Sequence, residues 1–118
     1  MDVNDRLVAA LEPFGDPVWF GVYRTEKDDK RAERYYTYNY TTFGADHRDN
    51  EPRFLKHLVQ VHFFCPLSFR SVSRARQTRK ALRDAGFTFP STVNATDTDG
   101  QHIIFECEYV EEADYADA

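Results

Sequence analysis

One stretch of the sequence, RFLKHLVQVHFFCP at residues 53–66, limits the fold more than any other. Successive side chains of a β-strand point to opposite faces of a sheet, and both sets here contain apolar residues. Leu55 and Val59 fall in one set, while Phe54 and Leu58 fall in the other. A run that is apolar on both faces is typical of a strand inside a sheet. We therefore expect a central strand here, with a neighbour on each side.

Four other stretches are strand candidates. RYYTYNYTTF alternates strictly and places Tyr36, Tyr38 and Tyr40 on one face, and HIIFECEYVEE places Phe105 and Cys107 inward. VWFGVYR and TFPSTVNATD are weaker candidates, and the second ends in a hairpin-like turn, TDTDG. FGADHRDNEP, rich in turn-forming residues, predicts a turn or a long hairpin tip. The charged stretch TEKDDKRAER predicts an exposed loop.

Two helices complete the pattern. The first is an amphipathic helix at residues 3–14, which prolines and glycines at positions 13–17 terminate. The second runs to Ala85, with Gly86 as its left-handed cap. Its apolar stripe comprises Val72, Ala75, Thr78, Leu82 and Ala85. The fold class predicted is α+β: a mainly antiparallel, twisted sheet of about five strands with both helices packed on one face.

Length and composition describe one domain of an ordinary globular class. A chain of 118 residues can bury a single core without disulfides or metals. We expect a single α+β domain at residues 1–112 and an acidic flexible tail at 113–118. Cys65 and Cys107 lie in apolar strands without CxxC spacing, which favours reduced, buried thiols. The sequence shows neither a signal peptide pattern nor a run long enough to span a membrane.

Charge is distributed very unevenly along the chain. Residues 70–85 hold six basic residues against one acidic residue, Asp84, which gives +5. Because the whole chain carries −5, the remaining residues carry −10. Charge separation of this size bears on binding partners more than on the fold. An acidic chain overall is a weak candidate for a dedicated nucleic-acid binder.

The residues that could do chemistry do not form a recognisable pattern. His57 and His62 are five residues apart on one strand, so they point to opposite faces and do not share a metal ion. Cys107 lies between two glutamates, which raises a thiol pKa and weakens a nucleophile. The sequence contains no GxSxG elbow and no glycine-rich phosphate loop. We therefore predict no enzymatic activity, no catalytic, cofactor or metal-ligating residue, and no cofactor.

The basic helix has three interpretations: a solvated face, a DNA-binding helix, or one half of a contact between copies of the chain. DNA binding requires a scaffold such as a helix-turn-helix, and no such motif precedes this helix. In the third interpretation its arginines face carboxylates of the next copy, either in a loop at 44–52 or along the edge formed by Glu106, Glu108, Glu111 and Glu112. Such a contact joins two different surfaces and can close into a ring. The interface candidates are Arg70, Arg74, Arg76, Arg79, Arg83, Asp46, Asp49, Glu51, Glu106 and Glu108.

Three stretches together resemble a known family. They are YTYNYTTFGADHRDNEPRFLKHLVQVHFFCPLS, RSVSRARQTRKALRDAGFTFPST and GQHIIFECEYVEE. Their order and spacing are similar to those of the tail terminator, or tail completion, proteins of long-tailed bacteriophages. The likeness covers nearly the whole chain from the opening helix to Glu112.

This resemblance implies a small α+β structural protein of the virion. Such proteins assemble as a ring, commonly a hexamer, at the head-proximal end of the tail tube. The ring ends tube polymerisation and provides the surface that joins the head connector. The implied partners are other copies of the chain, the tail tube protein and a head connector or head-completion protein, with DNA only passing through the lumen. The implied location is the tail-neck junction of a virion made in the host cytoplasm. Two alternatives stay open: another head-tail joining component, or a nucleic-acid-binding accessory protein that uses the helix at 70–85.

Overall fold

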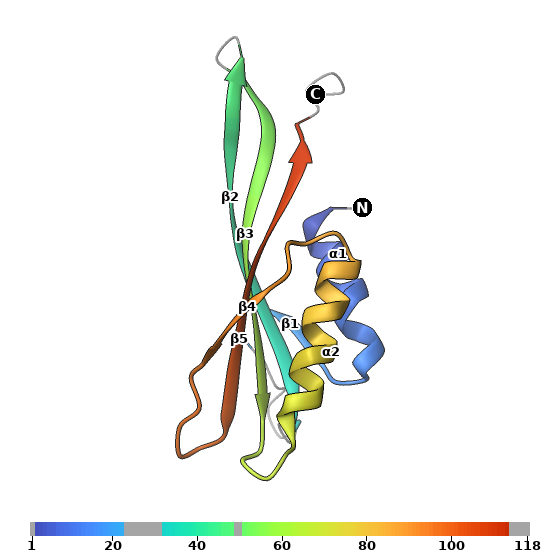
Figure 1. Cartoon of the computed structure of the whole chain (residues 1–118), viewed down its shortest axis with the longest axis vertical. Coiled ribbons are helices and arrows are strands. Elements are labelled where there is room, and N and C mark those ends of the chain that lie inside the picture. The colour runs from blue at the N-terminus through green and yellow to red at the C-terminus, as the bar shows by residue number, and fades with distance from the viewer. Residues whose placement is uncertain (1, 23–31, 49–50, 114–118) are drawn as a thin grey trace.

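The computed structural model describes residues 2–22, 32–48 and 51–113, with residues 46–48 described by their backbone alone. Its elements follow one another as α1 (Val3–Leu11), the 3-10 turn η1 (Glu12–Phe14), β1 (Val18–Phe20), β2 (Tyr35–Arg48), β3 (Glu51–Cys65), α2 (Ser71–Asp84), β4 (Ser91–Asn94) and β5 (Gln101–Glu112). The strands form one sheet in the order β1-β2-β3-β5-β4 (Figure 1). Among the described strands, β1 and β2 pair in parallel and the other neighbours pair antiparallel. The α+β prediction is confirmed.

Strand β3 is the centre of this sheet, as its two apolar faces predict. It pairs antiparallel with β2 along one side and with β5 along the other. Within this strand, Val61 lies opposite Tyr38 of β2 and Phe105 of β5. These three side chains point to the same face and are nearly inaccessible to solvent. The register therefore brings the apolar sets of three strands together on one side of the sheet.

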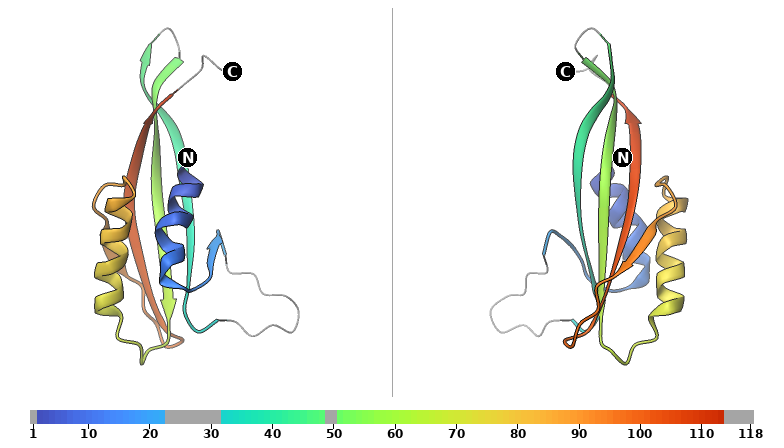
Figure 2. Two further views of the ribbon diagram at one scale, coloured as in Figure 1. Left: turned by 90° about the vertical axis from the view of Figure 1, so that its right-hand side faces the viewer. Right: turned by 60° about the vertical axis from the view of Figure 1, so that its left-hand side comes forward.

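The hydrophobic core lies between this face of the sheet and the two helices. Figure 1 shows both helices on the same side of the strands. Buried side chains of β2, β3 and β5 meet buried side chains of α1 and α2 there. The core comprises Val3, Leu7, Leu11, Tyr36, Tyr38, Val59, Val61, Phe63, Cys65, Leu82, Phe87, Phe105 and Cys107. On the opposite face, called the outer face below, no helix of the described residues is packed (Figure 2).

Local signals fix where the helices begin and end. The Asp2 carboxylate caps α1 by accepting the backbone N–H of Asp5 at 2.8 Å. After α2 the chain turns at Gly86, whose φ of 102° suits glycine. One expectation for this helix is wrong: Val72 is 68% exposed and lies outside the apolar stripe. Thr78 and Leu82 are its buried residues.

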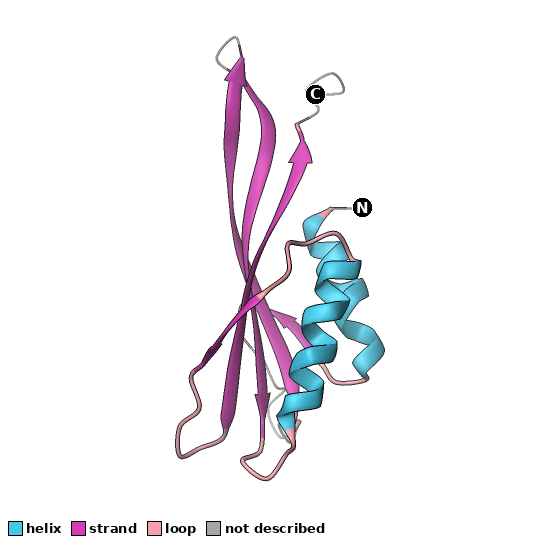
Figure 3. Cartoon of the chain, in the orientation of Figure 1, coloured by secondary structure: helices cyan, strands magenta, loops and turns pink. Residues whose placement is uncertain are grey.

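For residues 43–52, the prediction of a turn is wrong and its alternative, the end of a long hairpin, is what the structure shows. Strand β2 continues to Arg48 and β3 begins at Glu51, with Gly44 opposite Leu55. The turn is confined to the neighbourhood of residues 49–50, which lie outside the described residues. Antiparallel pairing supplies backbone hydrogen bonds between the two strands, which offsets the poor strand propensity of Gly, Asp and Asn. The resulting long hairpin extends beyond both helices (Figure 3).

The first strand is shorter than its sequence predicts. VWFGVYR contributes only Val18–Phe20, and the strand ends before Gly21, which adopts φ of 80°. This backbone conformation is unfavourable for continuing a strand of L-residues, which explains the early end. The weak candidate at 88–97 contributes Ser91–Asn94, and an Asp97–Gly100 bridge closes the predicted turn before β5.

Truncation of two apolar residues on α2, one buried and one exposed, should have different effects on stability. Leu82→Ala removes a fully buried side chain and should lower the free energy of unfolding by about 2–5 kcal/mol, through lost burial and a residual cavity. Val72→Ala on the same helix should change it by less than about 0.5 kcal/mol. Denaturant unfolding of both variants measures the difference. Equal effects would contradict the assignment of Val72 to the surface.

Candidate functional site

The arginines of the basic segment have different surroundings, and Arg74 is mostly buried. Its guanidinium donates to the Asp16 carboxylate at 2.6 Å, and the two side chains are only 14% and 12% exposed. It also lies over the rings of Phe14, Phe63 and Phe69, at 5.1, 5.1 and 5.6 Å from their centroids. Arg74 thus stabilises the fold of its own chain and is not available to a contact surface.

Arg79 and Arg83 are partly engaged within the chain. The Nε of Arg79 donates to the Pro90 carbonyl oxygen at 3.0 Å, and its guanidinium lies 4.4 Å from the centroid of the Phe89 ring. Arg83 pairs with its neighbour Asp84 at 3.1 Å, and both side chains are largely exposed. An exposed pair of this kind contributes little to stability. Both arginines therefore remain at the surface.

The remaining basic side chains form a continuous stripe along α2. Residues three or four apart lie on one face of a helix, so positions 72, 76, 79, 80 and 83 fall on the same side of α2. Arg76 and Lys80 are exposed and form no hydrogen bond or ion pair with the described residues. The stripe, called the basic ridge below, comprises Val72, Arg76, Arg79, Lys80 and Arg83. Arg70 is also exposed and precedes the helix at its N-cap position, without a capping hydrogen bond from its side chain.

The predicted acidic loop at 44–52 is not a loop. Asp46 lies in β2 with its side chain outside the described atoms, and Asp49 lies outside the described residues altogether. Glu51 is the first residue of β3 and is exposed. Glu51 and the backbone of Asp46 lie at the far end of the hairpin that extends beyond the helices, away from the basic ridge of the same chain.

The predicted acidic edge at the end of the chain is divided between two faces. Glu111 faces the helix side, where its carboxylate contacts His57 Nε2 at 2.7 Å. Glu106 and Glu108 face outward, and pairing with β4 places Glu106 inside the sheet rather than at its edge. Glu112 alternates onto the same outward face and is exposed, so Glu106, Glu108 and Glu112 are available for the predicted contact. The sequence predicts which β5 side chains share a face, because they alternate along the strand. It does not predict that β5 lies between β3 and β4 in the sheet.

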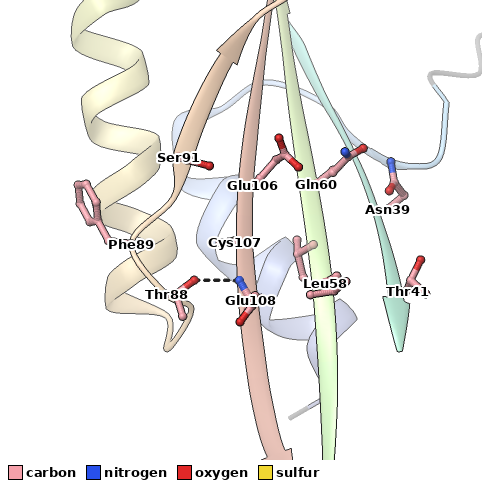
Figure 4. A pocket seen from close by; sticks show the side chains of 11 residues that line it. Asn39, Thr41, Leu58, Gln60, Thr88, Phe89, Ser91, Glu106, Cys107 and Glu108 are labelled. Carbon is pink, nitrogen blue, oxygen red and sulfur yellow. Dashed lines mark hydrogen bonds between the residues drawn. The ribbon is translucent and has the colours of Figure 1, made fainter. Parts of the chain in front are cut away.

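A groove of about 620 Å³ crosses the outer face at these two glutamates. It is lined by side chains from β2 to β5 and from the segment before β4, as Figure 4 shows. Leu58 and Phe89 are 41% and 54% exposed there. The Glu106 carboxylate accepts no hydrogen bond from the described residues, and Glu108 pairs with Lys56 at 3.3 Å. We call this hollow, which includes Asn39, Leu58, Gln60, Phe89, Glu106 and Glu108, the outer groove.

Two histidine networks connect the central strands and were not predicted. On the helix side, His57 bridges Thr42 of β2 at 2.6 Å and Glu111 of β5 at 2.7 Å, which ties the three strands together. On the outer face, His62 Nδ1 and His102 Nε2 are 2.8 Å apart. The sequence places His57 and His62 on opposite faces, as observed, but pairing partners depend on strand register, which alternation alone does not give.

The two cysteines are held in their protonated, unreactive form by burial and, at Cys107, by a neighbouring charge. Desolvation raises the pKa of Cys107 to about 12, and the Glu108 charge adds to this effect. Burial also raises the pKa of the Cys65 thiol. A protonated, buried thiol is a poor nucleophile and a poor metal ligand. Across the described part of the chain, no three His, Cys, Asp or Glu side chains are grouped to hold a metal ion.

Comparisons with known proteins identify the fold but not the family. No family model matches the chain, and no curated protein matches it. Seven chains of solved structures match. One of them, whose title gives no activity, is 15% identical, with a TM-score of 0.61 over 96% of this chain and 94% of that one. A likeness at this identity supports the fold alone. Among the described residues, no helix is both long and apolar enough to cross a membrane.

Removal of two arginines from α2 should have very different effects on stability. Arg74→Met leaves the mostly buried Asp16 carboxylate without its closest partner and should lower the free energy of unfolding by about 3 kcal/mol. Arg76→Met, at an exposed position on the same helix, should change it by less than about 0.5 kcal/mol. Thermal and denaturant unfolding measure both. Similar losses in the two variants would contradict the internal role of Arg74.

The histidine pair on the outer face predicts that stability falls in mild acid. Burial lowers the pKa of His62 and of His102, and the proximity of His102 lowers that of His62 further, although Glu106 and Asp97 act in the opposite direction. The unfolded chain therefore binds more protons than the folded chain just below pH 6.5. The contribution of the neutral histidine pair to stability is complete above this pH. It is lost as the pH falls through the lower pKa values that the two histidines have in the folded chain.

A pH series of melting temperatures from about 7.5 to 5 tests this dependence. The melting temperature of the wild type should decrease more steeply than that of the His62→Gln/His102→Gln variant. Glutamine keeps hydrogen-bonding groups at both positions but does not titrate, so it is the matched control. Parallel pH profiles for the two proteins would show that the pair does not cause the dependence.

Proposed function

We propose that this chain is a structural assembly protein of a bacteriophage tail. It forms a ring, with six subunits as the expected number, that caps the head-proximal end of the tail tube and ends tube polymerisation. The observation that carries the proposal is the separation of charge on the folded domain. A basic ridge lies on the helical layer, and acidic side chains lie in a groove on the opposite face of the sheet. The resemblance of nearly the whole chain to tail terminator proteins supports the same function.

Charge separation of this kind favours contacts between unlike surfaces of successive copies. Such heterologous contacts close into a ring when the rotation between copies permits it. The long β2–β3 hairpin adds further contact area, because it extends past the helices (Figure 1). Beyond Tyr38, the outer edge of β2 has no strand paired with it among the described residues. Free strand edges are suited to contacts with other chains.

The partners proposed for such a ring follow from its position. One rim meets the tail tube protein, and the other meets the head connector or a head-completion protein. DNA passes through the lumen. The location is the tail-neck junction of the virion, after synthesis in the host cytoplasm. A head-completion role is the nearest alternative, and it would place the same ring on the other side of the joint.

A nucleic-acid-binding accessory protein is the second alternative. Arg70, Arg76 and Lys80 are exposed and available to phosphate, whereas Arg74 is paired with Asp16. Burial of Arg74 reduces the number of charges that this helix can offer to a duplex. If duplex DNA does bind, the affinity should fall steeply with salt, because each neutralised phosphate releases counterions.

Light scattering of the purified protein over a range of concentrations, with and without assembled tail tubes, tests the proposal. A ring-sized species, or capping of the tube ends in electron micrographs, is the expected result. A protein that stays monomeric with tubes present and binds DNA in a salt-dependent way would overturn it. Tube binding at the end that meets the tail tip would also contradict a role at the neck.

A further inference from the structure

We infer that the basic ridge of one copy docks into the outer groove of the next copy. This inference rests on the proposed self-assembly and names the two surfaces that would form the subunit contact. The ridge supplies cations and the groove supplies carboxylates. Val72, Arg76 and Arg79 of the ridge also border a second hollow of about 300 Å³ between α2 and β4. The occupant of the outer groove is therefore a second copy of this chain, presented through α2.

Unsatisfied charge on the ridge is the first reason. Arg76 and Lys80 are exposed without partners among the described residues. Val72, at the start of the same stripe, exposes 68% of its surface. The ridge thus combines exposed cations with an exposed apolar residue. This composition is more typical of a contact surface than of a solvated helix face.

The groove offers the complementary groups. Glu106 has no hydrogen-bond partner among the described residues, and Glu108 is satisfied only by a surface pair with Lys56. Leu58 and Phe89 present apolar surface beside these carboxylates. Opposite charges around an apolar centre provide both specificity and affinity when two surfaces meet. The groove thus matches the ridge in charge and in the presence of exposed apolar groups.

The dimensions of the two surfaces also agree. The ridge runs from residue 72 to residue 83, which corresponds to about 17 Å at 1.5 Å per residue. The groove crosses the sheet from β2 to β4, which are three strand spacings apart, or about 14 Å. One exposed face of three helical turns can therefore span the groove.

The contact must join two chains. The ridge belongs to the helical layer. Within one copy, Arg79 of the ridge lies over the Phe89 ring at the border of the groove, 4.4 Å from the ring centroid, whereas Glu106 and Gln60 lie on the face of the sheet that α2 does not cover (Figure 4). Each copy consequently offers one ridge and one groove, so every added copy exposes another of each until the assembly closes.

Charge exchange provides the sharpest test. Arg76→Glu/Lys80→Glu gives an acidic ridge, and Glu106→Lys/Glu108→Lys gives a basic groove. Each variant alone should associate at least about tenfold more weakly than the wild type, because like charges now meet at every contact. A one-to-one mixture should restore association, since each variant presents the surface that the other needs. Sedimentation over a concentration series, with tail tubes where the free protein is monomeric, measures the effect.

Two controls separate this result from loss of the fold or of net charge. Asp5→Lys/Glu12→Lys makes the same change in charge as the groove variant but on α1 and the adjoining η1 turn, and it should associate like the wild type. The melting temperature of every variant establishes that it is folded. If the wild type forms rings and the exchange variants form them equally well, the docking surfaces are wrong while the proposed function stands. If the wild type forms no ring even on tubes, the docking surfaces and the proposed function are both wrong.

Discussion

The structure depends on one constraint: its central strand is apolar on both faces, but only one face is covered by helices. Strand β3 is paired along both sides, so its hydrogen bonds are satisfied within the sheet. On the helix side, Val59, Val61 and Phe63 are buried. On the outer face, Leu58 remains 41% exposed beside the groove. A second layer would complete this arrangement, and an assembling protein can obtain that layer from another copy of itself.

Much of the fold could be predicted because its signals are local. Alternation identified the three long strands, helical spacing identified both helices, and Gly86 marked the end of α2. Register, sheet order and the extent of the hairpin could not be predicted in this way. They depend on pairing between distant residues, which overrode the turn propensity of residues 43–52. The histidine pair His62–His102 escaped prediction for the same reason.

The surroundings of the charged residues also depend on contacts between distant parts of the chain, which local sequence signals do not give. The sequence gives the total charge of the segment at 70–85, but it treats all its arginines alike. Arg74 lies four residues before the buried Thr78 and eight before the buried Leu82, so it shares the face of α2 that meets the core. That spacing is a usable signal, although the burial of an arginine also requires a carboxylate and aromatic rings from elsewhere in the chain. Asp16 and three phenylalanines supply them.

The arrangement of charge also limits the symmetry that an assembly can adopt. In a two-fold dimer built on either surface, a ridge would meet a ridge or a groove would meet a groove, and like charges would be brought together. A head-to-tail contact avoids this repulsion, because every ridge meets a groove. At physiological salt, charge interactions are screened beyond about 8 Å, so attraction acts mainly once the surfaces are close. Charge would then select the direction of assembly, while apolar contact from Leu58, Phe89 and Val72 would hold the closed ring together.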